Sequence, residues 1–225
     1  MSRRLPDLSV YLVTDPHACR PRGVAETVRL AVAGGATCVQ LRDKQASDAA
    51  LVDVARSAKA ALAGSGVPLI VNDRLAVAQA VAADGLHLGQ GDGDPAAARA
   101  ALGPRAILGL SIDHPGQLAA VDPRVVDYVG ASPVFATATK PDHAAPLGLT
   151  GLAEICAASP VPVVAIGGLA VADVAAVLNA GAAGLAVVSA ICAAADPAAA
   201  AAAFAGAIRS HRAAPTARTA KETLR

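Results

Sequence analysis

Short apolar runs rich in Val, Ile and Leu recur along the chain, and an Ala-rich stretch follows most of them. This alternation is typical of βα units around a parallel sheet, whose strands are buried on both faces. The length of the runs fits such buried strands. The predicted strands are residues 10–14, 38–42, 69–72, 85–88, 107–111, 128–131, 163–166 and 185–188.

The Ala-rich stretches predict the helical halves of the same units. They cover residues 24–33, 47–63, 75–82, 95–102, 115–121, 150–158, 171–179 and 196–209. Glycines follow several of them, as expected where a helix ends in a left-handed conformation. Eight units in 225 residues close into a barrel more naturally than they fill an open sheet, so the sequence predicts one (β/α)8 TIM barrel over residues 1–210.

Two segments fall outside this alternation. Residues 132–149, after the sixth predicted strand, form a long irregular connection. Loops of that length in a compact domain are usually functional or disordered, and we expect a mobile lid. Residues 211–225 combine Arg and Lys with small residues and lack apolar periodicity, which predicts a disordered basic tail.

Charge and composition narrow the classes of function. A formal net charge of +1 provides no field to attract nucleic acid or an anionic membrane, so we expect small-molecule ligands held by a few placed groups. The sequence shows neither a secretory signal nor a membrane span, which indicates a cytoplasmic protein. Reduced, buried thiols are predicted because the cysteines lack metal-ligand or redox spacing; they are Cys19, Cys38, Cys156 and Cys192.

Polar residues gather directly after most of the predicted strands, which is where a βα barrel places its active site. In strand order from the second to the eighth, they are Gln40 to Lys44, Asn72 with Asp73, Asp92, Ser111, Thr137 to Lys140, Gly167 with Gly168, and Ser189.

Gln40, Arg42 and Lys44 alternate along the chain, so an extended segment places them on one face, pointing into the barrel mouth. A solvated charge cluster is the alternative. However, a glutamine and an arginine inside a buried strand are costly without partners or a ligand. We therefore interpret this segment as ligand-binding.

Asp73 and Asp92 stand at the ends of neighbouring strands, where two carboxylates could hold Mg²⁺ together with water and substrate phosphate. The alternative for Asp73 is an N-cap of the following helix. Asp94 is better placed than Asp92 to cap the helix that opens on Pro95, which leaves Asp92 for another role.

Three short segments are candidates for phosphate binding. Gly167-Gly168 and Val188-Ser189 follow the seventh and eighth strands, where such barrels frequently bind phosphate through backbone N–H groups. Thr137, Thr139 and Lys140 add two hydroxyls and an ammonium. A plain turn or a polar surface loop is the alternative in each case.

The histidines provide no obvious catalytic group. His87 lies between two leucines, which favours a structural histidine over a catalytic base. The other four, His17, His114, His143 and His211, show no metal-ligand spacing.

Taken in order, these residues resemble the motifs of the thiamine phosphate synthase family. The resemblance covers about residues 8 to 209, and eight motifs in order are far more specific than any one of them. They are Tyr11-Leu12-Val13-Thr14-Asp15, Gln40-Leu41-Arg42-Asp43-Lys44, Val71-Asn72-Asp73-Arg74, Gly85-Leu86-His87-Leu88-Gly89-Gln90-Gly91-Asp92, Asp127-Tyr128-Val129-Gly130, Thr137-Ala138-Thr139-Lys140, Ala165-Ile166-Gly167-Gly168 and Val187-Val188-Ser189-Ala190-Ile191.

The resemblance implies a transferase that joins 4-amino-2-methyl-5-hydroxymethylpyrimidine diphosphate to 4-methyl-5-(2-hydroxyethyl)thiazole phosphate. It also implies three groups of site residues. The pyrimidine diphosphate site falls on Gln40, Leu41, Arg42, Asp43, Lys44, Asn72, Ser111 and Lys140, the thiazole phosphate site on Thr137, Ala138, Thr139, Gly168, Val188 and Ser189, and the Mg²⁺ ligands on Asp73 and Asp92.

The chemistry implied by the family is a dissociative substitution, in which diphosphate leaves, a pyrimidine methylene cation forms and the thiazole nitrogen captures it. We expect Arg42, Lys44 and Lys140, with Mg²⁺, to stabilise the charge on the leaving diphosphate. Ser111 completes the expected catalytic set.

Two other functions stay open. One is an isomerase related to thiazole tautomerase, which uses a histidine on the same barrel and needs no diphosphate site. The other is a non-catalytic module that binds a phosphorylated ligand. The sequence also leaves the oligomeric state open, and a homo-oligomer is one possibility.

Overall fold

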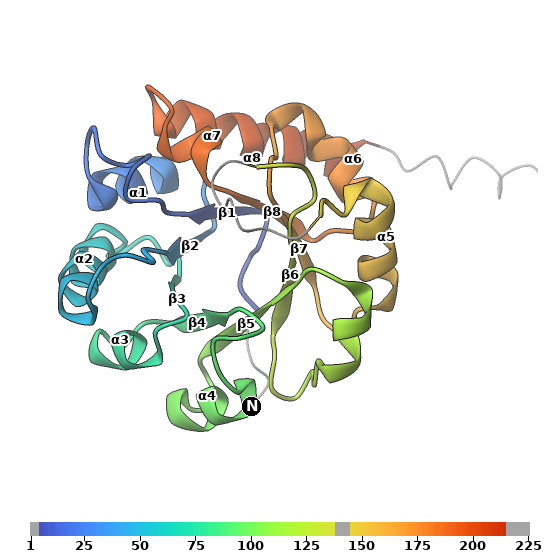
Figure 1. Ribbon diagram of the computed structural model, residues 1–225. Helices are drawn as coiled ribbons and strands as arrows, with labels where there is room; N and C mark the ends of the chain where they lie inside the picture. Colours follow the sequence, from blue (N-terminus) through green and yellow to red (C-terminus); the bar gives the residue numbers. More distant parts are fainter. Residues whose placement is uncertain (1–4, 138–144, 215–225) are drawn as a thin grey trace, which may run out of the picture.

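The computed structural model describes residues 5–137 and 145–214, and within them eight parallel strands close into a barrel. The strands pair in chain order, and the last pairs with the first, so that Tyr11 lies between Cys38 on one side and Ala186 on the other. Figure 1 looks into this ring, with the helices outside it. The strands are β1 Val10–Val13, β2 Cys38–Leu41, β3 Leu69–Asn72, β4 Gly85–Leu88, β5 Ile107–Ile112, β6 Tyr128–Ala131, β7 Val163–Ile166 and β8 Gly184–Val187. The predicted TIM barrel is confirmed.

Helices follow the strands and form the outer layer. Two of them begin with the same device: Asp94 and Asp196 each accept two backbone N–H groups, and a proline occupies the first helical position. The α-helices are α1 Val24–Ala33, α2 Asp48–Ala61, α3 Leu75–Ala80, α4 Pro95–Leu102, α5 Gly148–Ala158, α6 Val174–Asn179, α7 Ser189–Cys192 and α8 Pro197–Ala213. Two 3₁₀ segments, η1 Pro115–Ala120 and η2 Val171–Asp173, complete the described elements.

The core has two parts because side chains alternate across each strand. On β1, Val10 and Leu12 join the large apolar cluster between strands and helices. Tyr11 and Val13 instead join a smaller cluster that fills the barrel interior. The strand residues therefore read as nearly continuous apolar runs, because both of their faces are covered.

The fifth helical segment differs from the prediction. The sequence predicts an α-helix at residues 115–121, whereas Pro115–Ala120 forms a 3₁₀ helix capped by His114, whose Nδ1 accepts the Gly116 N–H at 3.0 Å. A segment this short, opening on Pro-Gly and followed by Pro123, offers few α-helical hydrogen bonds, and short 3₁₀ pieces are common in such connections.

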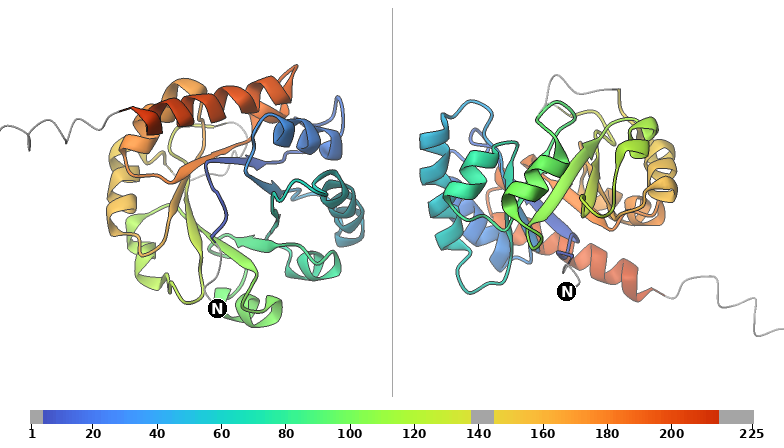
Figure 2. Two further views of the ribbon diagram at one scale, coloured as in Figure 1. Left: turned by 180° about the vertical axis from the view of Figure 1, so that it is seen from behind. Right: turned by 90° about the horizontal axis from the view of Figure 1, so that it is seen from below.

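Helix α8 also runs further than predicted, to Ala213, so residues 211–213 are helical and not part of a disordered tail. The Arg212 guanidinium explains this extension, because it donates to Ser9 Oγ at 2.8 Å and to the Ala183 carbonyl at 2.9 Å. Figure 2 shows α8 lying along the outside of the barrel, where it packs on α1, α6 and α7. The rest of the predicted tail, residues 215–225, lies outside the described residues.

A buried ion pair links α4 to the start of β6, at the end of the barrel opposite the strands' carboxyl ends. Arg99 donates to Asp127 Oδ2 at 2.6 Å, and its other N–H groups reach the backbone carbonyls of Gly103, Ala106 and Val125. Asp127 Oδ2 also accepts the Leu108 N–H. This network closes the connections that enter β5 and β6.

The prediction of reduced, buried thiols holds for three of the four cysteines, whereas Cys156 is only half-buried. All four are free thiols, and Cys19, Cys38 and Cys192 are buried. In the part of the chain that the structure describes, no helix combines the length and apolar character required for a membrane span.

Candidate active site

Two cavities open at the mouth of the barrel, where the strands end. The larger has a volume of about 680 Å³ and the smaller about 120 Å³. Ser132, Ile166 and Val188 line both, so they form a common wall. Both cavities thus lie at the carboxyl ends of the strands, where the sequence predicts the site.

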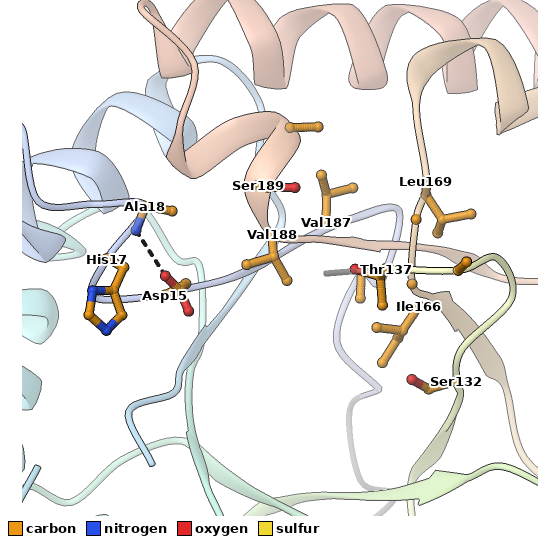
Figure 3. A pocket seen from close by; sticks show the side chains of 15 residues that line it. Asp15, His17, Ala18, Ser132, Thr137, Ile166, Leu169, Val187, Val188 and Ser189 are labelled. Carbon is orange, nitrogen blue, oxygen red and sulfur yellow. Dashed lines mark hydrogen bonds between the residues drawn. The ribbon is translucent and has the colours of Figure 1, made fainter. Parts of the chain in front are cut away.

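The larger cavity is surrounded by the loops that follow β1, β6, β7 and β8. Figure 3 shows Asp15 and His17 on one side, Thr137 and Leu169 on the other, and Ser189 between them. Gly168 and Val188 also line it. Four of the predicted thiazole phosphate residues thus lie together: Thr137, Gly168, Val188 and Ser189.

Two consecutive glycines allow the β6 loop to lie against the end of β7. Gly167 and Gly168 have φ angles of 103° and 65°, which favour glycine. A Cβ on Gly168 would stand 2.6 Å from the Ala136 carbonyl oxygen, a distance that requires a shift. The Val134 N–H donates to the Ile166 carbonyl at 2.7 Å, which holds the β6 loop against the end of β7. From there the loop continues to Thr137, which lines the larger cavity.

The smaller cavity contains most of the predicted pyrimidine diphosphate residues. They are Gln40, Arg42, Lys44, Asn72 and Ser111, and the two predicted metal ligands, Asp73 and Asp92, line it as well. The alternation inferred from the sequence is confirmed, because the side chains of Gln40, Arg42 and Lys44 reach one space.

Lys44 joins the two carboxylates. Its Nζ donates to Asp73 Oδ2 and lies 4.0 Å from Asp92 Oδ2. Asn72 Nδ2 donates to the other oxygen of Asp73 at 2.8 Å. Burial raises the pKa of the Asp73 carboxyl above its ordinary value, and the neighbouring Asp92 raises it further, while Lys44 opposes both effects. The carboxylates thus meet in a partly desolvated space that favours a cation.

The capping alternatives are also resolved by the geometry. The side chain of Asp73 does not cap α3, whose N-cap is Arg74 without a side-chain hydrogen bond. Asp94 caps α4, as predicted, while Asp92 Oδ2 accepts the Gly89 N–H at 2.9 Å. Both Asp73 and Asp92 therefore direct their carboxylates to the cavity and not to a helix terminus.

His87 lines the smaller cavity, and its surroundings agree with the structural role that the sequence favours. It is buried, and its ring nitrogens lie 2.9 Å from Tyr128 Oη and 2.9 Å from Ser111 Oγ. Burial lowers the pKa of His87 to about 4, and the negative charge of Asp92 offsets this only in part. A neutral ring with both nitrogens engaged is a poor general base near pH 7.

Some predicted residues do not meet at this site. Leu41 packs in the cluster between strands and helices, and the Asp43 carboxylate accepts the N–H groups of Gln45 and Ala46. Neither lines either of the two cavities at the barrel mouth. The predictions for Ala138, Thr139 and Lys140, and for part of the expected lid, fall outside the described residues.

Several residues that line the cavities do not stand out in the sequence as candidate site residues. Asp15 and His17 follow β1, and their position after a strand was the available signal. Asp15 Oδ1 accepts the Ala18 N–H at 2.8 Å and shapes that loop (Figure 3). Ser132 and Ile166 form the common wall, but nothing in their residue type distinguishes them from ordinary strand-end residues.

The family is decided by comparison with known proteins. A family model described as thiamine monophosphate synthase matches residues 10–191, most of the barrel. This chain belongs to the thiamine monophosphate synthase family. The resemblance inferred from the motifs is thereby confirmed.

Relatives within this family are similar over nearly the whole chain. A protein named thiamine-phosphate synthase from Xanthobacter autotrophicus is 55% identical over 206 residues, covering 92% of this chain and 98% of the relative. One of the same name from Azorhizobium caulinodans is 52% identical over 190 residues, covering 84% and 90%. The solved structure of thiamine phosphate pyrophosphorylase from Pyrococcus furiosus is 32% identical with a TM-score of 0.81, covering 92% and 98%.

Proposed function

We propose that this chain joins 4-amino-2-methyl-5-hydroxymethylpyrimidine diphosphate to 4-methyl-5-(2-hydroxyethyl)thiazole phosphate, giving thiamine phosphate and diphosphate. The chain is a transferase of thiamine biosynthesis, as its family and relatives indicate. One observation of the structure carries the assignment of the two substrates: two cavities of different chemistry share a wall at the barrel mouth. A reaction that joins two halves needs such adjoining spaces.

The smaller cavity suits the diphosphate-bearing half. Arg42 and Lys44 supply positive charge, and Asn72 supplies an amide beside them. Negative charge grows on the diphosphate as its bond to the pyrimidine methylene breaks, so fixed cations here stabilise the transition state more than the bound substrate. Gln40 and Ser111 lie deeper, where the pyrimidine ring would be held.

Mg²⁺ fits the donor set around Asp73 and Asp92. Hard cations take carboxylate oxygen ligands, and Mg²⁺ commonly keeps water and substrate phosphate for its other positions. The Lys44 ammonium lies between the two carboxylates, which supports a cation site in this space. Bound there, Mg²⁺ would neutralise diphosphate charge and improve it as a leaving group. Asp73 and Asp92 would hold the ion, and Lys44 would be released toward the diphosphate.

The larger cavity suits the thiazole phosphate. Gly168 and Ser189 bring the backbone of two loops to its edge, and Thr137 adds a hydroxyl. The common wall is largely apolar, since Ile166 and Val188 stand between the two spaces. An apolar wall would exclude water from the cationic intermediate while the thiazole nitrogen approaches.

The deciding assay mixes the protein with both phosphorylated halves and Mg²⁺ and measures thiamine phosphate and diphosphate by ³¹P NMR. We expect equal amounts of the two products. A tautomerase-like isomerase would give no coupled product, and a binding module would show thermal stabilisation by ligand without turnover. Either result would refute the assignment.

The roles of individual residues are tested by paired variants. Asp73→Asn should lower turnover by roughly 100-fold or more and increase the Mg²⁺ concentration needed for half-maximal rate. Asp53→Asn is the matched control, since its exposed carboxylate lies on α2 and pairs only loosely with Arg56 at 3.5 Å. Lys140→Ala should also lower turnover strongly. Near-normal rates in Asp73→Asn at limiting Mg²⁺ would remove that residue from the proposed metal site.

A further inference from the structure

A continuous chain of hydrogen bonds crosses the barrel interior beneath the smaller cavity. Gln40 Nε2 donates to Tyr11 Oη at 2.9 Å, and Tyr11 Oη lies 2.7 Å from Tyr128 Oη. Tyr128 Oη lies 2.9 Å from His87 Nδ1, and His87 Nε2 lies 2.9 Å from Ser111 Oγ. These hydrogen bonds therefore connect two residues of the proposed pyrimidine site through Tyr11, Tyr128 and His87; His87 also lines the smaller cavity, whereas the two tyrosines lie behind it.

The surrounding strands are shaped to hold these rings. Tyr11 and Tyr128 are the only tyrosines in the sequence, and both are fully buried in the barrel. A Cβ on Gly109 would stand 2.2 Å from Tyr128 Cζ and 2.4 Å from His87 Nδ1, so β5 needs glycine there. The tyrosine rings meet edge to face at 5.9 Å, and the Tyr128 ring lies 5.5 Å from that of His87.

Donor and acceptor accounting gives the chain a direction. Gln40 Nε2 can only donate, so the Tyr11 hydroxyl accepts this hydrogen bond and donates its own to Tyr128 Oη. The Tyr128 hydroxyl then donates to His87 Nδ1. An accepting Nδ1 leaves the ring proton on Nε2, which donates to Ser111 Oγ. Each hydroxyl and the imidazole thus has one assigned role.

The direction fixes what the two ends present to the cavity. The Ser111 hydroxyl accepts from His87 and keeps its own proton to donate to a ligand. Gln40 commits an amide N–H to Tyr11, so its Oε1 is turned away from the tyrosine. Within the described residues, every buried side-chain nitrogen and oxygen has a hydrogen-bond partner. Gln40 Oε1 makes no hydrogen bond to these residues, so it is not a buried atom. Because Gln40 lines the smaller cavity, its Oε1 is accessible from there.

We propose that Tyr11 and Tyr128 are positioning residues that select the aminopyrimidine by holding Gln40 Oε1 as an acceptor and the Ser111 hydroxyl as a donor. This inference rests on the proposed function. An aminopyrimidine offers the matching pair, because its exocyclic amine donates and a ring nitrogen accepts. A site built to bond an N–H group rejects an analogue that lacks it. Without either tyrosine hydroxyl, the amide of Gln40 is free to reverse.

The test compares two substrates in competition, the pyrimidine diphosphate and its analogue with hydrogen in place of the 4-amino group. The variants are Tyr11→Phe, Tyr128→Phe and the double variant, each of which keeps the rings and removes only hydroxyls. The ratio of kcat/KM values in competition does not depend on how much of a variant is folded. Thr27→Val is the control, because it deletes a fully buried hydroxyl that donates to the Gly23 carbonyl at 2.8 Å, on the opposite side of the β-sheet.

We expect each tyrosine variant to reduce the preference for the amino substrate by about tenfold, the size of one lost hydrogen bond to a fixed partner. The double variant should lose no more than the single variants, because one chain is broken in each case. The KM for thiazole phosphate should stay unchanged in the tyrosine variants. Thr27→Val should keep the wild-type preference for the amino substrate.

Two outcomes would overturn the inference. The preference could persist while turnover of both substrates falls equally, or Thr27→Val could lose the preference as well; the tyrosines would then be only structural. The wild-type protein is measured in the same assay. If it forms no thiamine phosphate from the amino substrate, the proposed function itself fails, and that result is distinguishable from a change in the ratio.

Discussion

Acid should destabilise this protein through His87. The ring is buried, and burial lowers its pKa to about 4 from an ordinary value of 6.5. The unfolded chain binds a proton to this histidine between these values and the folded chain does not, so the free energy of unfolding falls as the pH decreases through that window. The contribution of the neutral ring is complete above pH 6.5 and lost below pH 4.

The size of the effect follows from the same pKa values. The difference between a pKa of 6.5 in the unfolded chain and about 4 in the folded chain corresponds to about 3 kcal/mol of unfolding free energy over the full window. Between pH 7 and pH 5, the part that is lost is about 2 kcal/mol. Burial also raises the pKa of Asp73 above its ordinary value. The contribution of His87 must therefore be isolated by a variant that does not titrate at position 87. His87→Asn keeps a polar side chain at the site without an imidazole.

The assay is urea unfolding in EDTA at several pH values, followed by far-UV circular dichroism and by tyrosine fluorescence. Both tyrosines lie in the barrel interior and the chain has no tryptophan, so the fluorescence reports on the core. Coincident transitions would justify a two-state treatment. We expect the free energy of unfolding of the wild type, minus that of His87→Asn, to fall by about 2 kcal/mol from pH 7 to pH 5. A difference that stays constant over this range would refute the reasoning.

Three further variants test other parts of the structure. Asp127→Ala should lower the free energy of unfolding by about 3 to 5 kcal/mol, because it leaves the buried Arg99 guanidinium without its counter-ion, while turnover per folded molecule stays normal. Gly168→Ala should raise the KM for thiazole phosphate about tenfold or more, since its Cβ would displace the β6 loop; an unchanged KM would contradict the loop contact. Arg212→Ala should cost about 1 to 2 kcal/mol in urea unfolding by removing two hydrogen bonds, and Arg209→Ala, on the same helix, should cost less.

The barrel could be predicted from the sequence because each strand and helix is specified by the residue pattern within its own short segment. Each strand is an apolar run, and the expected and observed bounds of β3, β4, β6 and β7 coincide. The strand-end position of Lys44, Asp73 and Ser111 follows from the same pattern, since parallel strands end at one face. Differences appear where competing short-range effects are close in energy, as in the fifth segment, where Pro and Gly favour a 3₁₀ helix.

The barrel interior could not be predicted in the same way. Tyr11 and Tyr128 are 117 positions apart, and their contact exists only because eight strands close into a ring. Each tyrosine alone is an ordinary aromatic residue in a buried strand. The significance of His87 had the same origin: the sequence indicated a structural histidine, but its two partners come from β5 and β6.

The two halves of the barrel mouth divide the chemistry between side chains and backbone. Charged side chains come from the loops after β2, β3 and β4, including Arg42, Lys44 and Asp73. The loops after β7 and β8 contribute mainly glycine, small residues and backbone. A diphosphate that must leave carries more charge than a phosphate that only anchors its substrate, so the stronger field belongs on the first half. Ile166 and Val188 stand at the boundary between the two cavities. In the proposed assignment, the reacting carbon and nitrogen would meet at this boundary, where the electrostatic field changes and the apolar side chains exclude water.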